Sequence, residues 1–250
     1  MIEFLIKNMI METKQFEEII EEHLKRFEQQ VELPFNEDLE QQMSFVRDGI
    51  LDVEKYMAAP VKILWVLKEA NSPDDSIGND MRPCLTSLHS DDDTNSIAPK
   101  WGHTWNSVAY TTYGIFEKMN WVNLPDIKGD AKEVLKHMPK IAHVNVKKFA
   151  GESKAKDKEM KMFFDQYKAL IYEQIEIINP DVIIFGSTFK YFSDYFNGKE
   201  KIHEWPPVYK SQDKLLIDTC HPNGLRGFGM TQQQYCDHII NAVIQWMEKR

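Results

Sequence analysis

Four short apolar runs constrain the fold of this chain more than any other feature. Each is rich in strand-forming residues and is followed by polar or small residues; the runs are residues 61–67, 141–146, 182–185 and 215–219. Such runs are typical of strands buried on both faces of a sheet. Helical patterns lie before the third run and, from Thr231, after the fourth. Strands alternating with helices predict an α/β fold with crossover connections and a mostly parallel sheet.

The first 60 residues have a different pattern. Apolar residues recur at helical spacing in two stretches, residues 16–27 and 39–50, which Pro34 separates and Pro60 ends. We therefore expect residues 1–60 to form a helical N-terminal extension packed on a main domain of residues 61–250.

Composition excludes several classes of protein. No stretch approaches 18 consecutive apolar residues, so we expect no membrane span. The formal net charge of −9 counts against strong nonspecific binding of DNA, without excluding a local basic patch. Cys84, Cys220 and Cys236 are odd in number and widely spaced, which predicts neither a disulfide scaffold nor a zinc site. We expect a cytoplasmic monomer without metal or cofactor.

A long polar segment follows the first apolar run. Residues 71–106 are rich in Ser, Asp, Asn and Pro and include three successive aspartates at 91–93. We expect an irregular loop, since long loops in compact domains are often functional. The aspartate run is more typical of a solvated surface than of a metal site.

Polar side chains follow or interrupt all four apolar runs. Glu69 follows the first, Asn145 lies within the second, Ser187 follows the third and His221 follows the fourth. Because the carboxyl ends of parallel strands meet at one edge of a sheet, we expect a shared pocket there. The Asn145 amide fits a structural hydrogen bond and a recognition group about equally well. His221 precedes Pro222, which restricts its backbone to extended conformations.

The order of these motifs resembles that of the uracil-DNA glycosylase superfamily, over roughly residues 61–248. The matching segments are Ile-Leu-Trp-Val-Leu-Lys-Glu-Ala at 63–70, Ala-His-Val-Asn-Val-Lys-Lys at 142–148, Asn-Pro-Asp-Val-Ile-Ile-Phe-Gly at 179–186 and His-Pro-Asn-Gly-Leu-Arg-Gly-Phe at 221–228. The resemblance implies a three-layer α/β/α fold around a central four-stranded, mostly parallel sheet. The iron–sulfur branch of the family has four cysteines that this chain lacks, so no cluster is expected.

The resemblance also implies roles for single residues. Glu69 would position or activate a water molecule, Asn145 would read the Watson–Crick edge of a flipped base, and His221 would stabilise the departing uracil anion. An aromatic side chain, Trp101 or Trp105, would stack on the base. Leu225 would act as a wedge that fills the vacated stack, and Arg226 follows it in the same motif. Independently of the resemblance, Lys147 and Lys148 are candidates for DNA contacts. The two lysines open a lysine-rich stretch that is either a phosphate track or a solvated surface.

Three hypotheses for function follow. The first is a base-excision glycosylase that hydrolyses the N-glycosidic bond of uracil or another altered base in DNA. The second is a non-catalytic member of the superfamily that binds a nucleotide, a nucleic acid or a protein. The third is an unrelated hydrolase that uses Glu69 and His221 for different chemistry.

Overall fold

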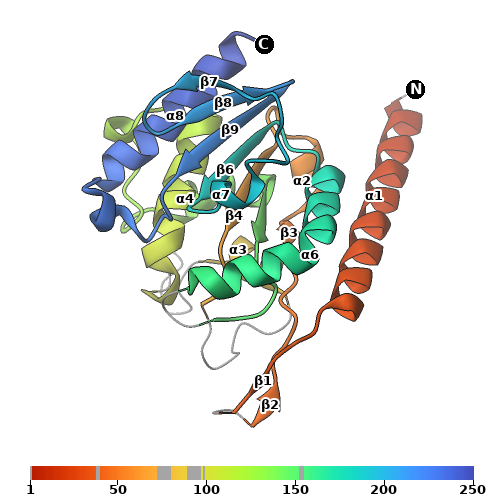
Figure 1. Ribbon diagram of the computed structural model, residues 1–250. Helices are drawn as coiled ribbons and strands as arrows, with labels where there is room; N and C mark the ends of the chain where they lie inside the picture. The colour runs from red at the N-terminus through yellow and green to blue at the C-terminus, as the bar shows by residue number, and fades with distance from the viewer. Residues whose placement is uncertain (1, 38–39, 72–79, 89–96, 98, 152–154) are drawn as a thin grey trace.

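The computed structural model describes residues 2–37, 40–71, 80–88, 97, 99–151 and 155–250 (Figure 1). Its main feature is a sheet of seven strands in the order β3-β5-β4-β6-β9-β8-β7. The strands are β3 (Gly49–Ile50), β4 (Ile63–Leu67), β5 (Ile141–Asn145), β6 (Val182–Gly186), β7 (Glu200–His203), β8 (Val208–Ser211) and β9 (Lys214–Thr219). A separate two-stranded hairpin is formed by β1 (Phe35–Asn36) and β2 (Gln41–Gln42).

The four predicted strands are confirmed as β4, β5, β6 and β9. They lie side by side and run parallel, with Leu67 level with Asn145 and Gly186 level with Thr219. The prediction that the sheet has only four strands is wrong. Antiparallel β3 extends one edge, and antiparallel β8 and β7 extend the other. These strands escaped the sequence pattern because β3 is only two residues long and β7 is fully exposed and largely polar.

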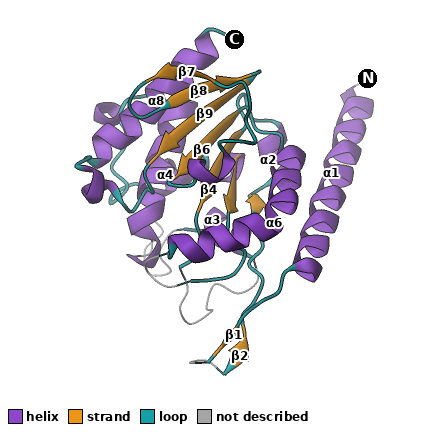
Figure 2. Ribbon diagram, viewed as in Figure 1, coloured by secondary structure: helices purple, strands orange, loops and turns teal. Residues whose placement is uncertain are grey.

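Helices cover both faces of the sheet (Figure 2). On one face, α4 (Pro99–Glu117) and α8 (Gln232–Glu248) pack on Trp65 and Ile184, with α3 (Met81–Thr86) and α5 (Ala131–Leu135) beside them. On the other face, α6 (Asp157–Ile178), α2 (Val53–Met57) and α7 (Phe189–Phe192) pack on Val66 and Phe185. Helix α1 (Ile2–Gln30) lies outside α6 in the same layer. The 3₁₀ turns are η1 (Trp121–Asn123), η2 (Met138–Lys140) and η3 (Leu225–Phe228).

The predicted helices in the second half of the chain are confirmed. Helix α6 buries the apolar stripe expected over residues 160–178. Helix α8 begins at the predicted cap: the Thr231 hydroxyl accepts from the backbone N–H of Gln234, whose side chain accepts from the backbone N–H of Thr231.

Two expectations about the first half of the chain are wrong. Of the stretch 39–50, which was expected to be helical, the described residues 40–50 are not helical; they contain β2 and β3, and β3 joins the main sheet by pairing with β5. Residues 71–106 are not irregular throughout, since they contain α3 and the start of α4. Tertiary pairing overrides the helical spacing of residues 39–50. The domain boundary between residues 60 and 61 stays a prediction.

Among the residues that the structure describes, no helix combines the length and the apolar character needed to cross a lipid bilayer.

Candidate functional site

The strand order defines a switch point at the carboxyl edge of the sheet. The chain passes from β4 to β5 on one side and then to β6 on the other side of β4. Ligands of open α/β sheets bind in the crevice at such a point. Gly186 ends β6 there, and a Cβ atom on it would lie 2.5 Å from Cδ2 of Leu67 and 3.2 Å from Cδ of Pro222. The missing side chain therefore lets the His221–Pro222 segment lie against the end of β4.

Backbone geometry fixes His221 in this crevice. Ser187 adopts a left-handed conformation, with φ of 61°, and its hydroxyl accepts from the backbone N–H of His221 at 2.9 Å. A non-glycine residue in this conformation is often part of a functional site. The backbone N–H of Asn223 donates to Nδ1 of His221 at 3.2 Å, so the proton of the neutral ring is on Nε2.

The electrostatic surroundings keep the His221 ring neutral. Burial and, to a smaller extent, the nearby ammonium group of Lys68 lower its pKa to about 4. At neutral pH, His221 is therefore an uncharged imidazole whose Nε2–H can donate a hydrogen bond.

Asn145 ends β5 with its side chain on the α3 face of the sheet. The residue is almost fully buried, and its Nδ2 donates to Sδ of Met81 at 3.4 Å. A thioether is a weak acceptor, so this contact satisfies little of the hydrogen-bonding capacity of the amide. The backbone N–H of Asn145 donates to the carboxylate of Asp48 at 2.7 Å.

His143 is a site residue that sequence reasoning missed. It lies two residues before Asn145 on the same face of β5. Its ring packs edge-on against the Trp105 ring, with 5.0 Å between the ring centroids. Neither ring nitrogen has a hydrogen-bond partner of good geometry within the described residues. Burial lowers the pKa of His143 to about 4; Asp48 and Asn145 raise it, and Lys148 and His221 lower it. His143 and Asn145 are thus neighbours on one face of β5. The alternating apolar pattern of β5 offered a signal, since two polar residues interrupt it on the same face.

Glu69 lies elsewhere. It forms an ion pair with Lys147, and both line a cavity of about 980 Å³ between the β1–β2 hairpin and α6. Its walls are aromatic, with Phe149 and Tyr167 among them. The structure thus places Glu69 in a cavity that neither Asn145 nor His221 lines. This separation argues against a hydrolase in which Glu69 and His221 act on one substrate.

The residue that follows β4 on the Asn145 face is Ala70. It is buried in the same core cluster as Leu67, Met81 and Trp105. An alanine supplies no carboxylate, so the described end of β4 places no general base beside Asn145.

Both lysines predicted to contact DNA are buried. Lys148 is 0% exposed, and its ammonium donates to Asp48 at 2.6 Å. Lys147 pairs with Glu69 and lies 4.5 Å from the centre of the Phe149 ring. The Lys148 ammonium is enclosed by the fold and cannot reach a phosphate, which corrects the prediction for that residue, whereas Lys147 is occupied by its ion pair with Glu69. Of the exposed lysines that follow, Lys161 pairs with Asp165 at 2.6 Å.

The other predicted residues lie around the same edge. Leu225 is half-buried in η3 and packs against the core, whereas Arg226 is exposed. Trp105 is 4% exposed and packs on His143, so it is part of the site wall. Trp101 belongs to α4, but its side chain lies outside the described residues.

Within the described part of the chain, no three His, Cys, Asp or Glu side chains gather as a metal ion would require. The aspartates at 91–93 lie outside the described residues. A scan against models of known protein families and a search of curated proteins give no match to this chain.

Proposed function

We propose that this protein binds an altered nucleobase, uracil or a related base, at the switch point and hydrolyses its N-glycosidic bond to DNA. In this proposal the Asn145 amide reads the edge of the flipped base, and the His221 ring donates a hydrogen bond to the departing base. The proposal rests on the motif order described above and on the geometry of these two residues.

The neutral His221 ring is the observation that carries the proposal. When a glycosidic bond breaks, negative charge develops on the departing base. A fixed N–H donor in a buried site stabilises such charge, and one donor of this kind contributes roughly 3–4 kcal/mol to a transition state. The hydrogen bond from Asn223 orients the His221 ring, and burial keeps it neutral at physiological pH.

A second candidate is supported by a different observation. Glu69 is paired with Lys147, and the next residue, Ala70, is buried in the core cluster with Met81 and Trp105. Because Glu69 is paired away in another cavity, the described end of β4 supplies no carboxylate to activate water, and this fits a protein that binds a base or nucleotide without hydrolysing it. For either candidate we propose a cytoplasmic location, because Cys84, Cys220 and Cys236 are all free thiols.

The test compares release of free base with binding. Purified protein is incubated with single- and double-stranded oligonucleotides that each carry one uracil or another altered base, and free base is measured by chromatography. The key variant is His221→Gln, and the matched control is His203→Gln on the exposed strand β7.

Base release by the wild type and the His203 variant, but not by the His221 variant, supports the glycosylase. Binding of a base-containing probe without release, weakened by His221→Gln, supports the binding protein. Neither binding nor release with any probe refutes both.

A further inference from the structure

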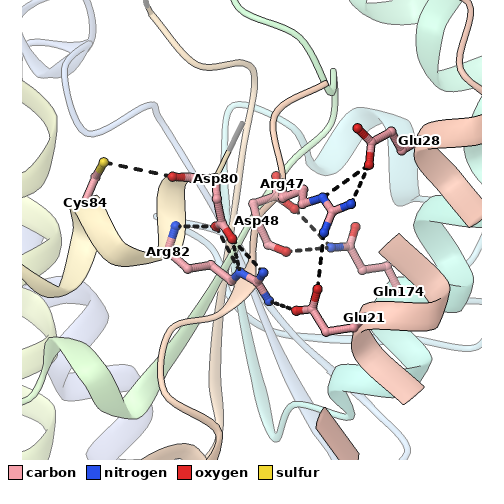
Figure 3. A network of polar contacts seen from close by, with 8 residues as sticks. All are labelled: Glu21, Glu28, Arg47, Asp48, Asp80, Arg82, Cys84 and Gln174. Carbon is pink, nitrogen blue, oxygen red and sulfur yellow. Dashed lines mark hydrogen bonds and ion pairs between the residues drawn. The ribbon is translucent and has the colours of Figure 1, made fainter. Parts of the chain in front are cut away.

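Asp48 lies just before the edge strand β3, in the part of the chain where sequence reasoning placed no functional residue. Its carboxylate is 1% exposed. It accepts three hydrogen bonds: from the backbone N–H of Asn145 at 2.7 Å, from Nζ of Lys148 at 2.6 Å and from Nε2 of Gln174 at 3.0 Å. The contact with Gln174 of α6 is drawn in Figure 3. A buried carboxylate with this many donors is fixed in place.

We propose that Asp48 is a positioning residue: by holding the backbone of Asn145, it sets the orientation of the Asn145 side-chain amide in the candidate site. The inference rests on the proposed function for the role of that amide, but the contacts themselves do not depend on it.

The end of β5 is held from both sides. On one side, the backbone N–H of Val146 donates to the carbonyl of Leu67 in β4 at 3.0 Å. On the other side, the β3–β5 ladder ends with Gly49 opposite His143, so no strand residue is available to pair with Asn145. The Asp48 carboxylate takes the place of that missing partner.

Lys148 is the counter-ion of the Asp48 carboxylate. Its side chain is fully buried, and its ammonium donates to the same carboxylate. A buried carboxylate without a counter-ion would be costly in its ionised form. Lys148, which the sequence suggested as a phosphate contact, is therefore a buried structural partner of Asp48.

Arg47, the residue before Asp48, is linked to the side chain of Asn145 through Met81. The Arg47 carbonyl accepts from the backbone N–H of Met81 at 2.9 Å, and Met81 accepts from the Asn145 amide. The Arg47 guanidinium in turn binds Glu21 and Glu28 of α1 (Figure 3). Residues 47 and 48 thus reach Asn145 by two routes, through its side chain and its backbone.

The test measures the backbone N–H of Asn145, the group that Asp48 contacts, before any function is assumed. The double variant Asp48→Leu/Lys148→Met removes both buried charges together, so neither is left unpaired, and it leaves no side-chain acceptor for the backbone N–H of Asn145. The control variant Tyr56→Phe removes a buried hydrogen bond, from the Tyr56 hydroxyl to the carbonyl of Ile178, in the same layer of the fold. Hydrogen exchange of the Asn145 backbone N–H is followed by NMR in folded protein. Binding of a single-stranded oligonucleotide carrying one uracil is measured in parallel.

We expect exchange at Asn145 to become at least tenfold faster in the double variant, and affinity for the uracil probe to fall at least tenfold, with neither changed in Tyr56→Phe. Unchanged exchange at Asn145 would overturn the inference, as would faster exchange with unchanged probe affinity. If exchange accelerates but the wild type binds no base, the hold of Asp48 on Asn145 stands and the proposed function fails. Should the double variant not fold, Asp48→Asn and Gln174→Leu are compared by the same two measurements.

Discussion

Replacing His143 by glutamine tests whether the imidazole is buried in its neutral form. Burial lowers the pKa of His143 to about 4, against an ordinary value of 6.5. Above pH 6.5 the ring is neutral in both the folded and the unfolded chain. Between pH 6.5 and 4 the unfolded chain binds a proton that the folded chain does not. Folding stability therefore falls as the pH falls through this window, and His143→Gln removes that contribution.

The size of the effect follows from the two pKa values. Each unit of difference corresponds to about 1.4 kcal/mol, so the whole window is worth about 3 kcal/mol. Between pH 7.5 and pH 5, about 2 kcal/mol of it should be lost. Other groups titrate in the same range: His221 adds a contribution of the same sign, and Asp218, whose pKa burial raises to about 6, opposes it. The difference between wild type and variant cancels these contributions.

The assay is urea unfolding of both proteins at pH 7.5, 6 and 5, with the free energy extrapolated to water. We expect the stability advantage of wild type over His143→Gln to shrink by about 2 kcal/mol from pH 7.5 to pH 5. A difference that stays constant across this range would show that His143 titrates normally and is not buried as described.

Three further predictions concern single side chains. Glu69→Gln should leave base binding and release unchanged, because Glu69 lines a separate cavity with Lys147; a loss as large as that of His221→Gln would contradict the separation. Gly186→Ala should lower the free energy of unfolding in urea by about 1–3 kcal/mol, since the new Cβ would crowd Leu67, and it should weaken base binding. An unchanged free energy of unfolding would show that the end of β6 has room for a side chain. Thr231→Ala should lower stability by about 1 kcal/mol through loss of the α8 capping box while base binding stays unchanged, and a stability equal to wild type would mean that the cap is not formed in solution.

Much of the central fold was predictable because its signals are local. The four parallel strands are apolar runs in the sequence. Helix α6 has an apolar stripe and helix α8 has a capping box, and both signals are visible in the sequence. The edge strands were not predictable, since β3 is held by pairing with β5 over two residues and β7 has no buried side chain. Such strands depend on partners that lie far away in the sequence.

The candidate site was predictable in part for the same reason. Asn145 is the last residue of β5 and His221 comes just after β9, so the carboxyl edge of the sheet places both of them. Whether Glu69 faces the same crevice depends on the path of the chain after β4, and the sequence does not display this path. The role of Lys148 was misread because its burial depends on Asp48, which lies 100 residues earlier in the chain.

The state of the His221 ring tests the account most directly. NMR of ¹⁵N-labelled protein reports both the protonation of the ring and which nitrogen carries the proton, from pH 3 to pH 8. We predict a neutral ring with its proton on Nε2 at pH 7 and a titration midpoint near 4. A midpoint at or above 6.5, or a proton on Nδ1 at neutral pH, would contradict the account, because the ring would then not be the neutral Nε2–H donor that the proposal requires.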